Sequence, residues 1–594
     1  MKKLILKLIC AALCIALMPI SGAAVEDAFV SVPAINVPAQ AVQGAQAECD
    51  CVIMFDGESA VIDGDGAAYS GGKLLISAAG SYLLSGEFSG TVEINVKDDK
   101  KTELYLNGVC IEPADGPAIN VVKQDKSVRL ISCEDSVNLI KDSARTYTEA
   151  DAWDAAVYSK ADLVFEGEGE IYVTSGANKA VHSTDDIKIL SGSLFCVSAG
   201  TGIHGKDSVS ISGGRVCIES ASNGIKSTNA EKDGKGFTEI SGGEVFISAE
   251  GDGIDAETRV LISGGSIIIK TGGGYTASTE QRTEGFGMGG RGGWGGGPGG
   301  PGGRGGSGRS AEAQAADTVS QKAVKSGSML EISGGTLYID SVDDALHSNG
   351  SALVSGGDIY IYAGDDAVHA DSVLTVNGGQ LEVYSSYEGL EATVINITDG
   401  NIRLNASDDG INASGDDKEV TTGTTYSRFG GNGLGELNIS GGYIVVISDG
   451  DGVDSNNFIT MSGGTLLVYG PTQSMNGALD YETSFSYTGG TLLAVGAAGM
   501  AESVTSSENA GVIAFSTRSS LRGLLTLTDA EGNELIAFAA PKAYSSCVFV
   551  SPNVQSGASY SIYYGGTHQG ELLDYVYASG KTEGAELVGS VTAR

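Results

Sequence analysis

The sequence has little positive charge. It contains 36 Lys and Arg residues against 74 Asp and Glu, which gives a formal net charge of −38. A chain this acidic repels the phosphate backbone, so we exclude nucleic acid as a partner. The same charge repels an acidic polysaccharide unless divalent cations or a local basic patch intervene, whereas a neutral glucan is hardly affected by it.

Long apolar runs are absent after the first 24 residues. The chain begins MKKLILKLICAALCIALMPISGAAVED, with lysines, a short apolar run and then small residues at 22–24. This is the pattern of a secretory signal peptide over 1–24, and we expect cleavage near Ala24, before a spacer at 25–67. Cleavage removes three Lys and no acid, which takes the net charge from −38 to −41. No later stretch is apolar enough to span a bilayer, so we expect a secreted or cell-surface protein that does not insert into membranes.

Cysteine is scarce for an exported chain. The sequence has nine Cys, and Cys10 and Cys14 fall in the signal peptide. The seven that remain are an odd number without a zinc-type spacing, so neither disulfides nor zinc provides the framework of the fold. Cys196 and Cys217 are 21 residues apart. We expect them at the same outward position of neighbouring repeats, close enough for a disulfide.

Glycine, in contrast, is abundant and regularly placed. It supplies 89 of the 594 residues, and most repeats of Ser-Gly-Gly or a close relative are 21 or 22 residues apart. These markers begin at Ser212, Ser241, Ser263, Ser333, Ser355, Asn377, Thr398, Ser440 and Ser462. Regular spacing of this kind indicates a repeat architecture.

The segments between the markers alternate apolar and polar residues. GGTLYID and GGDIYIY are examples, each followed by a turn rich in Asp and Gly and then by a second strand. A period of two indicates strands, and short units that bury one side must stack on their neighbours. Leucine-rich repeats lack support because their Leu and Asn spacing is missing, and propeller blades are longer. We predict an all-β fold, a right-handed parallel β-helix over 68–470 with inward pairs such as Ile359 and Ile361.

Two regions depart from this period. Residues 276–327 contain GFGMGGRGGWGGGPGGPGGRGGSGRS, which we interpret as a disordered Gly/Arg-rich insertion. Residues 471–594 contain segments such as GVIAFSTRSS and LTLTDAEGNELIAFA, which are typical of antiparallel strands joined by tight turns. We expect a small C-terminal β-sandwich-like cap there.

Several strings resemble the clostridial-type carbohydrate-binding domain proteins. They are LYLNGVCIEPADGPAI (104–119), AAVYSKADLVFEGEG (155–169), GIHGKDSVSISGG (202–214), GIKSTNAEKDGKGF (224–237) and GDGIDAETRVLISGG (251–265). The known member of that family is a cellulose- and pectin-binding parallel β-helix related in shape to polysaccharide lyases. The resemblance implies extracellular polysaccharide binding with bound calcium.

Acidic residues recur at equivalent turns and form two columns. The first contains Asp252, Asp344, Asp366, Glu388, Asp409 and Asp451, and the second, three residues later, contains Asp255, His347, His369, Glu391, Asn412 and Asp454. Carboxylates stacked at ~4.8 Å repel by roughly 3.5 kcal/mol at an effective dielectric constant near 20, and a cation between them reverses the sign. Turn formation alone explains one Asp per corner but not acidic pairs such as Asp343-Asp344.

We therefore predict calcium ions held between coils. The predicted ligands are Asp252, Asp255, Asp344, Asp366, Glu388, Asp409, Asp451 and Asp454. His347 and His369 lie one repeat apart, but no third His or Cys completes a transition-metal set, so calcium is the better assignment.

Tyrosines are predicted to face outward on three consecutive repeats. They are Tyr338, Tyr360, Tyr362 and Tyr384. Aromatic rings can stack on the apolar faces of sugars, which favours a binding site for a linear glycan. Tyrosines in a ladder can equally stabilise the sheet through cross-strand contacts, and both interpretations stay open.

The sequence thus predicts an extracellular protein that binds polysaccharide, cellulose or pectin-type or both, with calcium in stacked acidic turns. Two alternatives remain. A calcium-dependent pectate lyase needs a base, for which Lys206, Lys226 and Arg403 are candidates without a distinctive catalytic set. A structural or adhesive protein of the cell surface would bind another protein instead.

Overall fold

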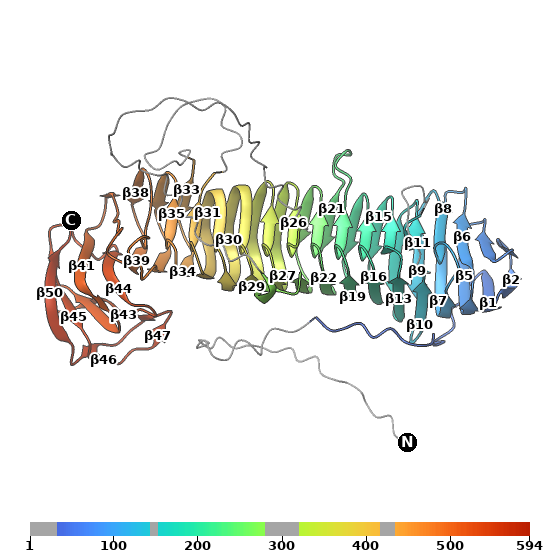
Figure 1. Cartoon of the computed structure of the whole chain (residues 1–594), viewed down its shortest axis with the longest axis horizontal. Coiled ribbons are helices and arrows are strands. Elements are labelled where there is room, and N and C mark those ends of the chain that lie inside the picture. Colours follow the sequence, from blue (N-terminus) through green and yellow to red (C-terminus); the bar gives the residue numbers. More distant parts are fainter. Residues whose placement is uncertain (1–31, 143–152, 279–319, 416–433) are drawn as a thin grey trace, which may run out of the picture.

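The computed structural model describes residues 32–142, 153–278, 320–415 and 434–594. Within these residues the fold is all-β, and its one helical element is the short 3-10 turn η1 (Tyr275–Ala277). A single 42-stranded sheet, mostly parallel, contains the larger part of the chain. Its strands stack along the long axis of the molecule, and the last strands form a separate unit at the C-terminal end (Figure 1).

From β10 (Val137–Lys141) to β24 (Arg259–Ile262), each strand pairs in parallel with the strand three positions later, and elsewhere some strands are long enough to span two or three faces. For example, β13 (Glu170–Ser175) pairs with β16 (Ser193–Ser198), and β16 pairs with β19 (Arg215–Ser220). We call three successive strands a coil and the three stacks of strands the first, second and third faces. This connectivity is that of a parallel β-helix, whose right-handed sense stays a prediction.

Each face is an uninterrupted parallel ladder. On the first face, strands β10 (Val137–Lys141), β13, β16 and β19 are followed by β22 (Glu244–Ala249), β25 (Ser266–Thr271), the ends of β27 (Met329–Ser341), β29 (Ser351–Ala363), β30 (Val368–Ser386) and β31 (Leu390–Ala406), then β34 (Tyr443–Ser448), β37 (Thr465–Tyr469) and β39 (Thr491–Gly496).

The second face has the shortest strands. It contains β4 (Lys73–Ile76), β6 (Thr91–Asn95), β8 (Ile119–Lys123), β11 (Ala155–Ser159), β14 (Lys179–Ser183), β17 (Ile203–Gly205), β20 (Ile225–Ser227), β23 (Ile254–Ala256), β26 (Val324–Ser326), β28 (Leu346–Ser348), the starts of β30 and β31, β32 (Ile411–Ala413) and β35 (Val453–Ser455).

The third face completes the coil. It contains the start of β7 (Thr102–Ile111), β9 (Val128–Ser132), β12 (Leu163–Gly167), β15 (Asp186–Ile189), β18 (Ser208–Ile211), β21 (Phe237–Ile240), β24 (Arg259–Ile262), the starts of β27 and β29, the middles of β30 and β31, β33 (Glu436–Ile439), β36 (Phe458–Met461), β38 (Ser484–Tyr487) and β40 (Ser506–Ser507).

The Ser-Gly-Gly markers form the corner between the third and first faces. The two positions of the marker require glycine for different reasons. A Cβ on the first glycine, Gly356, would lie 2.5 Å from the carbonyl oxygen of Ser333 in the preceding coil. The second glycine, Gly357, has φ of 90°, a conformation that residues with a side chain rarely adopt. The repeat length is therefore set where one corner must lie directly against the next.

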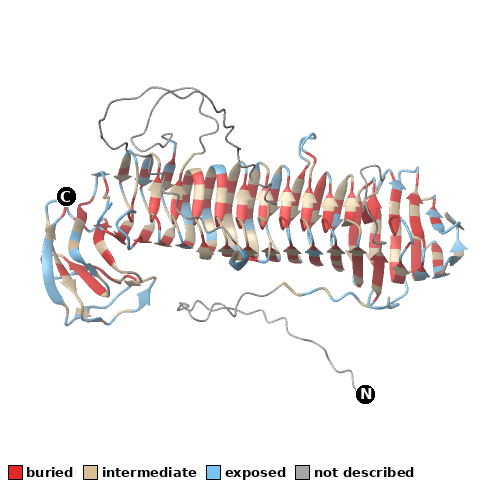
Figure 2. Ribbon diagram, in the orientation of Figure 1, coloured by how far each residue is buried: buried red, intermediate tan, exposed pale blue. Residues whose placement is uncertain are grey.

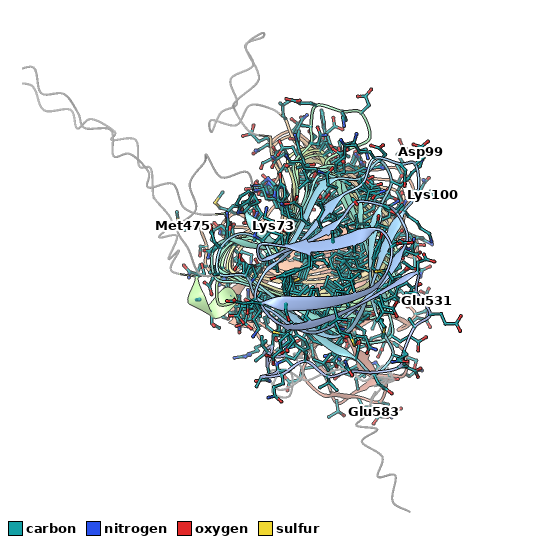
Figure 3. The ribbon with its side chains drawn as sticks, turned by 90° about the vertical axis from the view of Figure 1, so that its right-hand side faces the viewer. Lys73, Asp99, Lys100, Met475, Glu531 and Glu583 are labelled. Carbon is teal, nitrogen blue, oxygen red and sulfur yellow. The ribbon has the colours of Figure 1, made fainter. Side chains whose placement is uncertain are left out.

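The core lies between the three faces, and buried and partly buried residues alternate along the strands (Figure 2). The predicted inward pairs are all buried: Val216 and Ile218, Val245 and Ile247, Ile267 and Ile269, Leu337 and Ile339, Ile359 and Ile361, Leu381 and Val383, Ile444 and Val446, Leu466 and Val468. Seen from the N-terminal end, successive coils lie behind one another, and side chains such as Lys73 and Lys100 lie at their rim (Figure 3).

The parallel region extends beyond both of its predicted ends. β1 (Cys51–Gly57) pairs in parallel with β5 (Ser81–Phe88), so the predicted spacer at 25–67 already contains strands, including β2 (Ser59–Gly64) and β3 (Ala67–Ser70). At the other end, β38, β39 and β40 continue the parallel ladders past residue 470. The marker Thr488-Gly489-Gly490 belongs to this last part and follows Ser462 by 26 residues, a longer interval than the usual one.

Several predictions fall partly outside the described residues. Both the signal peptide and the arginines of the insertion lie there. Of the predicted insertion at 276–327, only 279–319 lies outside the described residues. The residues after it include β26, which belongs to the second face, so the predicted insertion extends too far. No helix in the described part of the chain is long and apolar enough to cross a membrane.

From Val512 onward the strands are antiparallel. β41 (Val512–Leu521) and β44 (Tyr544–Val550) extend the large sheet from β39. A second sheet has the order β47 (Leu572–Leu573), β48 (Val576–Tyr577), β43 (Glu534–Ala539), β42 (Leu524–Thr528), β45 (Ser559–Tyr564) and β50 (Glu586–Thr592), and β46 (Thr567–His568) pairs with β49 (Thr582–Glu583). Leu467, Leu493, Phe538 and Phe549 share one core, so this unit packs on the outside of the first face.

The predicted disulfide is wrong by one position. Cys217 pairs in register with Phe195, not with Cys196, and both Cys are free. Cys196 is fully buried because it points into the core, whereas Cys217 points outward beside Arg215. Gly192 and Gly214 are the equivalent positive-φ glycines before the two strands, and Cys196 follows the first by four residues whereas Cys217 follows the second by three. An offset of one residue reverses the direction of the side chain.

A bidentate ion pair joins the C-terminal unit to the first face. Arg403 Nε and Nη2 each donate to Asp574, at 2.9 Å. We expect Arg403→Ala to lower the free energy of unfolding of this unit by roughly 1 to 3 kcal/mol, because hydrogen bonds between charged groups are lost in a half-buried place. Calorimetry and limited proteolysis would detect the loosened unit. Lys270→Ala, which removes a more exposed pair with Asp340 on the same face, is the control, and equal behaviour of the two variants would contradict this role.

Candidate functional site

Chemically active side chains gather in one outward column on the second face. In register they are Tyr158, His182, His204, Lys226, Asp255, Lys325, His347, His369, Glu391, Asn412 and Asp454. We call this column the charge ladder. The predicted first acidic column runs beside it, at the corner between the first and second faces. Its members Asp252, Asp344 and Asp366 are buried.

In the N-terminal part of this site, lysines of the chain itself neutralise the carboxylates. Lys226 Nζ lies 2.7 Å from Asp255 Oδ2, and Lys322 Nζ lies 2.6 Å from Asp344 Oδ2. Asp252 accepts hydrogen bonds from Ser320 Oγ at 2.7 Å and from the backbone N–H of Lys322 at 2.9 Å. These carboxylates need calcium less, because each already has an ammonium group or hydrogen-bond donors of the chain beside it.

Next along the column, histidines take the place of lysine. His347 Nδ1 lies 2.8 Å from Asp344 Oδ2, and His369 Nδ1 lies 3.1 Å from Asp366 Oδ2 and 2.7 Å from Glu391 Oε2. Burial alone would lower the pKa of His369, but the hydrogen bonds to Asp366 and Glu391 raise it to about 11. For Asp366 itself, burial and the neighbouring carboxylates raise the pKa. A positive charge is therefore held among these acids.

The C-terminal part of the site differs in its ion pairs. Among the described residues, no Lys, Arg or His forms an ion pair with Glu388, Asp409 or Asp454 within 4.0 Å. Burial, followed by neighbouring carboxylates, raises the pKa of Glu388 to about 10, of Asp409 to about 9 and of Asp454 to about 7. The raised pKa values mean that these groups take up protons more readily than ordinary carboxyl groups.

The backbone makes room for these carboxylates at one glycine. A Cβ on Gly450 would lie 2.3 Å from Asp408 Oδ1 and 2.5 Å from Asp409 Oδ1. Asp409 Oδ1 also accepts the backbone N–H of Asp451 in the next coil, at 2.6 Å. The carboxylate of Asp409 therefore lies against the backbone of the next coil, and the charges of Asp451 and Asp454 act on it from there. Which of the predicted ligands bind calcium stays a prediction.

The tyrosines on the first face form two stacks instead of one row. Tyr338 stacks on Tyr360 with ring centroids 4.9 Å apart, and Tyr362 stacks on Tyr384 at 5.2 Å and on Tyr275 at 4.8 Å. Tyr384 does not continue the stack of Tyr338 and Tyr360, because Tyr360 pairs in register with Glu382. A register shift after Ile361 places Tyr384 on Tyr362 instead.

This stacking limits what the rings can do. Tyrosines that lie face to face cover most of one another's ring faces, and their edges point away from the core. All four predicted tyrosines are partly exposed. Both interpretations of the tyrosines therefore apply in part: the rings stabilise neighbouring coils, and their outer edges form an aromatic surface.

Sequence reasoning missed three contributors. Lys322 and Lys325 were assigned to the insertion, although VKSGSMLEISGG after Ala323 continues the repeat and places Lys325 level with Asp255. Tyr275 follows the last strand before the insertion, and nothing in its spacing indicated a place on Tyr362. An insertion of this length hides the register of the residues that follow it.

Comparison with known proteins identifies the family. The model of the carbohydrate-binding domain-containing proteins matches residues 70–367 and 365–521, which is most of the chain. The chain belongs to the carbohydrate-binding domain-containing protein family. The predicted family resemblance is thereby confirmed, and the matched residues include both tyrosine stacks and the whole charge ladder.

One relative in this family is a carbohydrate-binding domain-containing protein of Acetivibrio thermocellus. It is 29% identical over 148 residues, which are 24% of this chain and 51% of that protein. The match thus spans about half the length of the relative. A gadolinium derivative of the polysaccharide lyase-like protein from C. thermocellum is 28% identical, with 38% of this chain and 92% of that chain covered and a TM-score of 0.36. A score this low does not establish a shared fold.

The acids with raised pKa values predict how stability depends on pH. A carboxyl group with a raised pKa stabilises the folded state below its unfolded pKa, and this contribution is lost as pH rises through the folded pKa. Without divalent cations, the wild type should lose stability between about pH 4 and pH 9 relative to Asp409→Asn, with a slope of at most about 1.4 kcal/mol per pH unit. Denaturation in chelator would measure it. Glu436→Gln, on the third face, is the control, and parallel pH curves for wild type and Asp409→Asn would refute the assignment.

Proposed function

We propose that this protein is exported and binds polysaccharide on its first face, with calcium held at the adjoining acidic corner. Cellulose and pectin-type glycans are the proposed ligands. The observation that carries the proposal is the pair of tyrosine stacks, which lie partly exposed on consecutive coils. The chain also belongs to a family named for carbohydrate binding.

The shape of the first face supports a linear ligand. Outward side chains follow one another in register from Phe246 through Ile268 to Tyr338 and Tyr360. Beyond Tyr360 the row becomes polar at Glu382 and Arg403, where the C-terminal unit is attached. An extended chain lying across the coils would therefore pass over an aromatic and apolar surface and end at a charged one.

The mode of contact follows from the stacking. Because the tyrosine rings cover one another, a sugar would contact their edges and hydroxyls more than their faces. Edge contacts and hydroxyl hydrogen bonds are individually weak, so repetition over several coils has to supply the affinity. Such a surface suits a polymer better than a single sugar.

Calcium would allow an acidic glycan to approach. The net charge of −38 repels a polyuronate at long range. Ions held between neighbouring coils by Glu388, Asp409, Asp451 and Asp454 would neutralise part of that charge and could share their remaining coordination positions with uronate carboxylates. A neutral glucan needs no such bridge, so the two glycan classes should differ in their response to calcium.

The lyase alternative has less support. Of its candidate bases, Arg403 is paired with Asp574, and Lys226 Nζ lies 2.7 Å from Asp255. Both side chains are thus engaged with carboxylates of the protein instead of being directed at a substrate.

Removal of one tyrosine stack should weaken binding. We expect Tyr338→Ala combined with Tyr360→Ala to reduce affinity for the polysaccharide about tenfold or more, because each lost aromatic contact contributes ~0.5 to 1.5 kcal/mol. Affinity electrophoresis or pull-down, scaled to the folded fraction from circular dichroism, would measure it.

The matched controls separate binding from stability. Tyr338→Phe combined with Tyr360→Phe keeps both rings and should keep the melting temperature. Phe237→Ala removes an aromatic side chain from the third face and is the control for loss of a ring outside the proposed site. If the Ala double variant lost stability but bound as well per folded molecule as the wild type, the stacks would be purely structural and the site would lie elsewhere.

The calcium assignment makes a separate prediction. Capture on a polygalacturonate gel should require calcium and fail with chelator, whereas retention on insoluble cellulose should persist in both, because only the acidic glycan needs a bridging ion. Asp409→Asn combined with Asp451→Asn should abolish the calcium-dependent part alone. Equal capture of the polyuronate with and without calcium would contradict the bridge.

A further inference from the structure

Histidine is rare in this chain and concentrated on the charge ladder. The sequence has five His, and four of them form two stacked pairs one coil apart. The rings of His182 and His204 lie 4.5 Å apart, and those of His347 and His369 lie 4.8 Å apart. The two pairs have the same geometry in the fold but different neighbours, which allows one to be compared with the other.

Around the second pair, every ring nitrogen faces an oxygen. Besides its contacts to Asp366 and Glu391 through Nδ1, His369 has Nε2 3.2 Å from Asp371 Oδ1. Likewise His347 has Nδ1 at Asp344 and Nε2 2.8 Å from Asn349 Oδ1. A neutral imidazole has one N–H, and here Nε2 donates it, so Nδ1 carries no hydrogen. A cation must then lie between Nδ1 and the carboxylates. That cation is a proton or a metal ion.

Asp366 provides a second, independent indication of a ligand. Its side chain is 5% exposed, and its Oδ1 has no hydrogen-bond partner among the described residues, while Oδ2 faces His369. A proton on His369 satisfies Oδ2 alone. Buried carboxylate oxygens normally have a partner, and a metal ion bound to this carboxylate would provide one.

We propose that Asp366, His369 and Glu391 bind a transition-metal ion of the zinc class, at a site separate from the calcium site. The ligand atoms of these three residues all lie within 4.8 Å of one another. One imidazole nitrogen with carboxylate oxygens suits zinc and its neighbours in the periodic table, whereas calcium selects oxygen ligands.

The surroundings match those of metal-binding histidines. The Nε2–H of His369 is held by Asp371, which orients Nδ1 toward the ion, as a carboxylate commonly does for a metal-bound imidazole. Three protein ligands leave a fourth position open to solvent, and the side chains of His369 and Glu391 are each about a quarter exposed. The site does not depend on glycan binding.

The first histidine pair has the opposite electrostatics. His182 shares Asp154 with Lys179, and His204 donates to or accepts from Thr228 Oγ1 at 3.0 Å and lies next to Lys226 on the ladder. Two nearby ammonium groups repel a dication. His182→Gln is therefore a matched control for His369→Gln.

The experiment uses the full chain, stripped with chelator and then kept in excess calcium. Zn²⁺ is titrated against a coloured chelator, and Co²⁺ is followed by its visible absorption. We expect the wild type to bind Zn²⁺ stoichiometrically, His369→Gln and Asp366→Asn to bind it at least tenfold more weakly, and His182→Gln to be unchanged. Asp371→Ala, which alters an exposed side chain and should leave the fold intact, should weaken binding about 10- to 100-fold.

Three results would overturn the proposal. They are a wild type that retains no Zn²⁺, displacement of Zn²⁺ by calcium, and His369→Gln or Asp371→Ala binding as tightly as His182→Gln. Melting curves of each variant show whether a loss of binding reflects unfolding. None of these readouts involves a glycan, so the outcome is independent of the polysaccharide assays.

Discussion

The close contact between corners of successive coils determines the rest of this structure. At the markers with two glycines, the first glycine lies so near the carbonyl of the coil before it that a methyl group would collide, and the second has positive φ. At the marker beginning with Thr398, Asp399 takes the first place and only the positive-φ Gly400 remains. Only a chain that returns to this corner after a nearly constant number of residues can keep all three ladders in register. Inward aliphatic residues, outward tyrosines and the charge ladder are all aligned as a consequence.

Alignment also concentrates charge. Residues that are far apart in sequence but equivalent in the coil come to lie at strand spacing, where like charges repel strongly in a partly buried place. The chain meets this in different ways along one column: with Lys322 against Asp344, with His369 between Asp366 and Glu391, and, as far as the described residues go, with no ion pair at Asp409. Where the described residues supply no cation, protons, ions from solution or the rest of the chain have to do so.

The sequence predicted the parts of the structure that depend on period. Alternation identified the inward residues, such as Ile359 and Ile361, because one-sided burial forces it, and the markers identified the corners. Chemistry that depends on an exact register was harder. An offset of one residue directs Cys196 into the core instead of outward, and a register shift places Tyr384 next to Tyr362 instead of Tyr360. The lysines after the insertion could not be aligned, because their coil begins more than 40 residues from the strand it continues.

Both ends of the parallel stack finish in antiparallel strands. β1 turns back into β2 at the start, and β39 is followed by β44 and β41 at the end. A parallel edge with free N–H and C=O groups is a template on which a second copy can continue the ladder, and chain reversal removes part of that template. The parallel stack is thereby bounded by reversed strands at both ends. Duplication of one internal coil would lengthen the stack by one strand spacing, ~4.8 Å, and leave both closures unchanged, so the reach of its surface can change in steps without new folding chemistry.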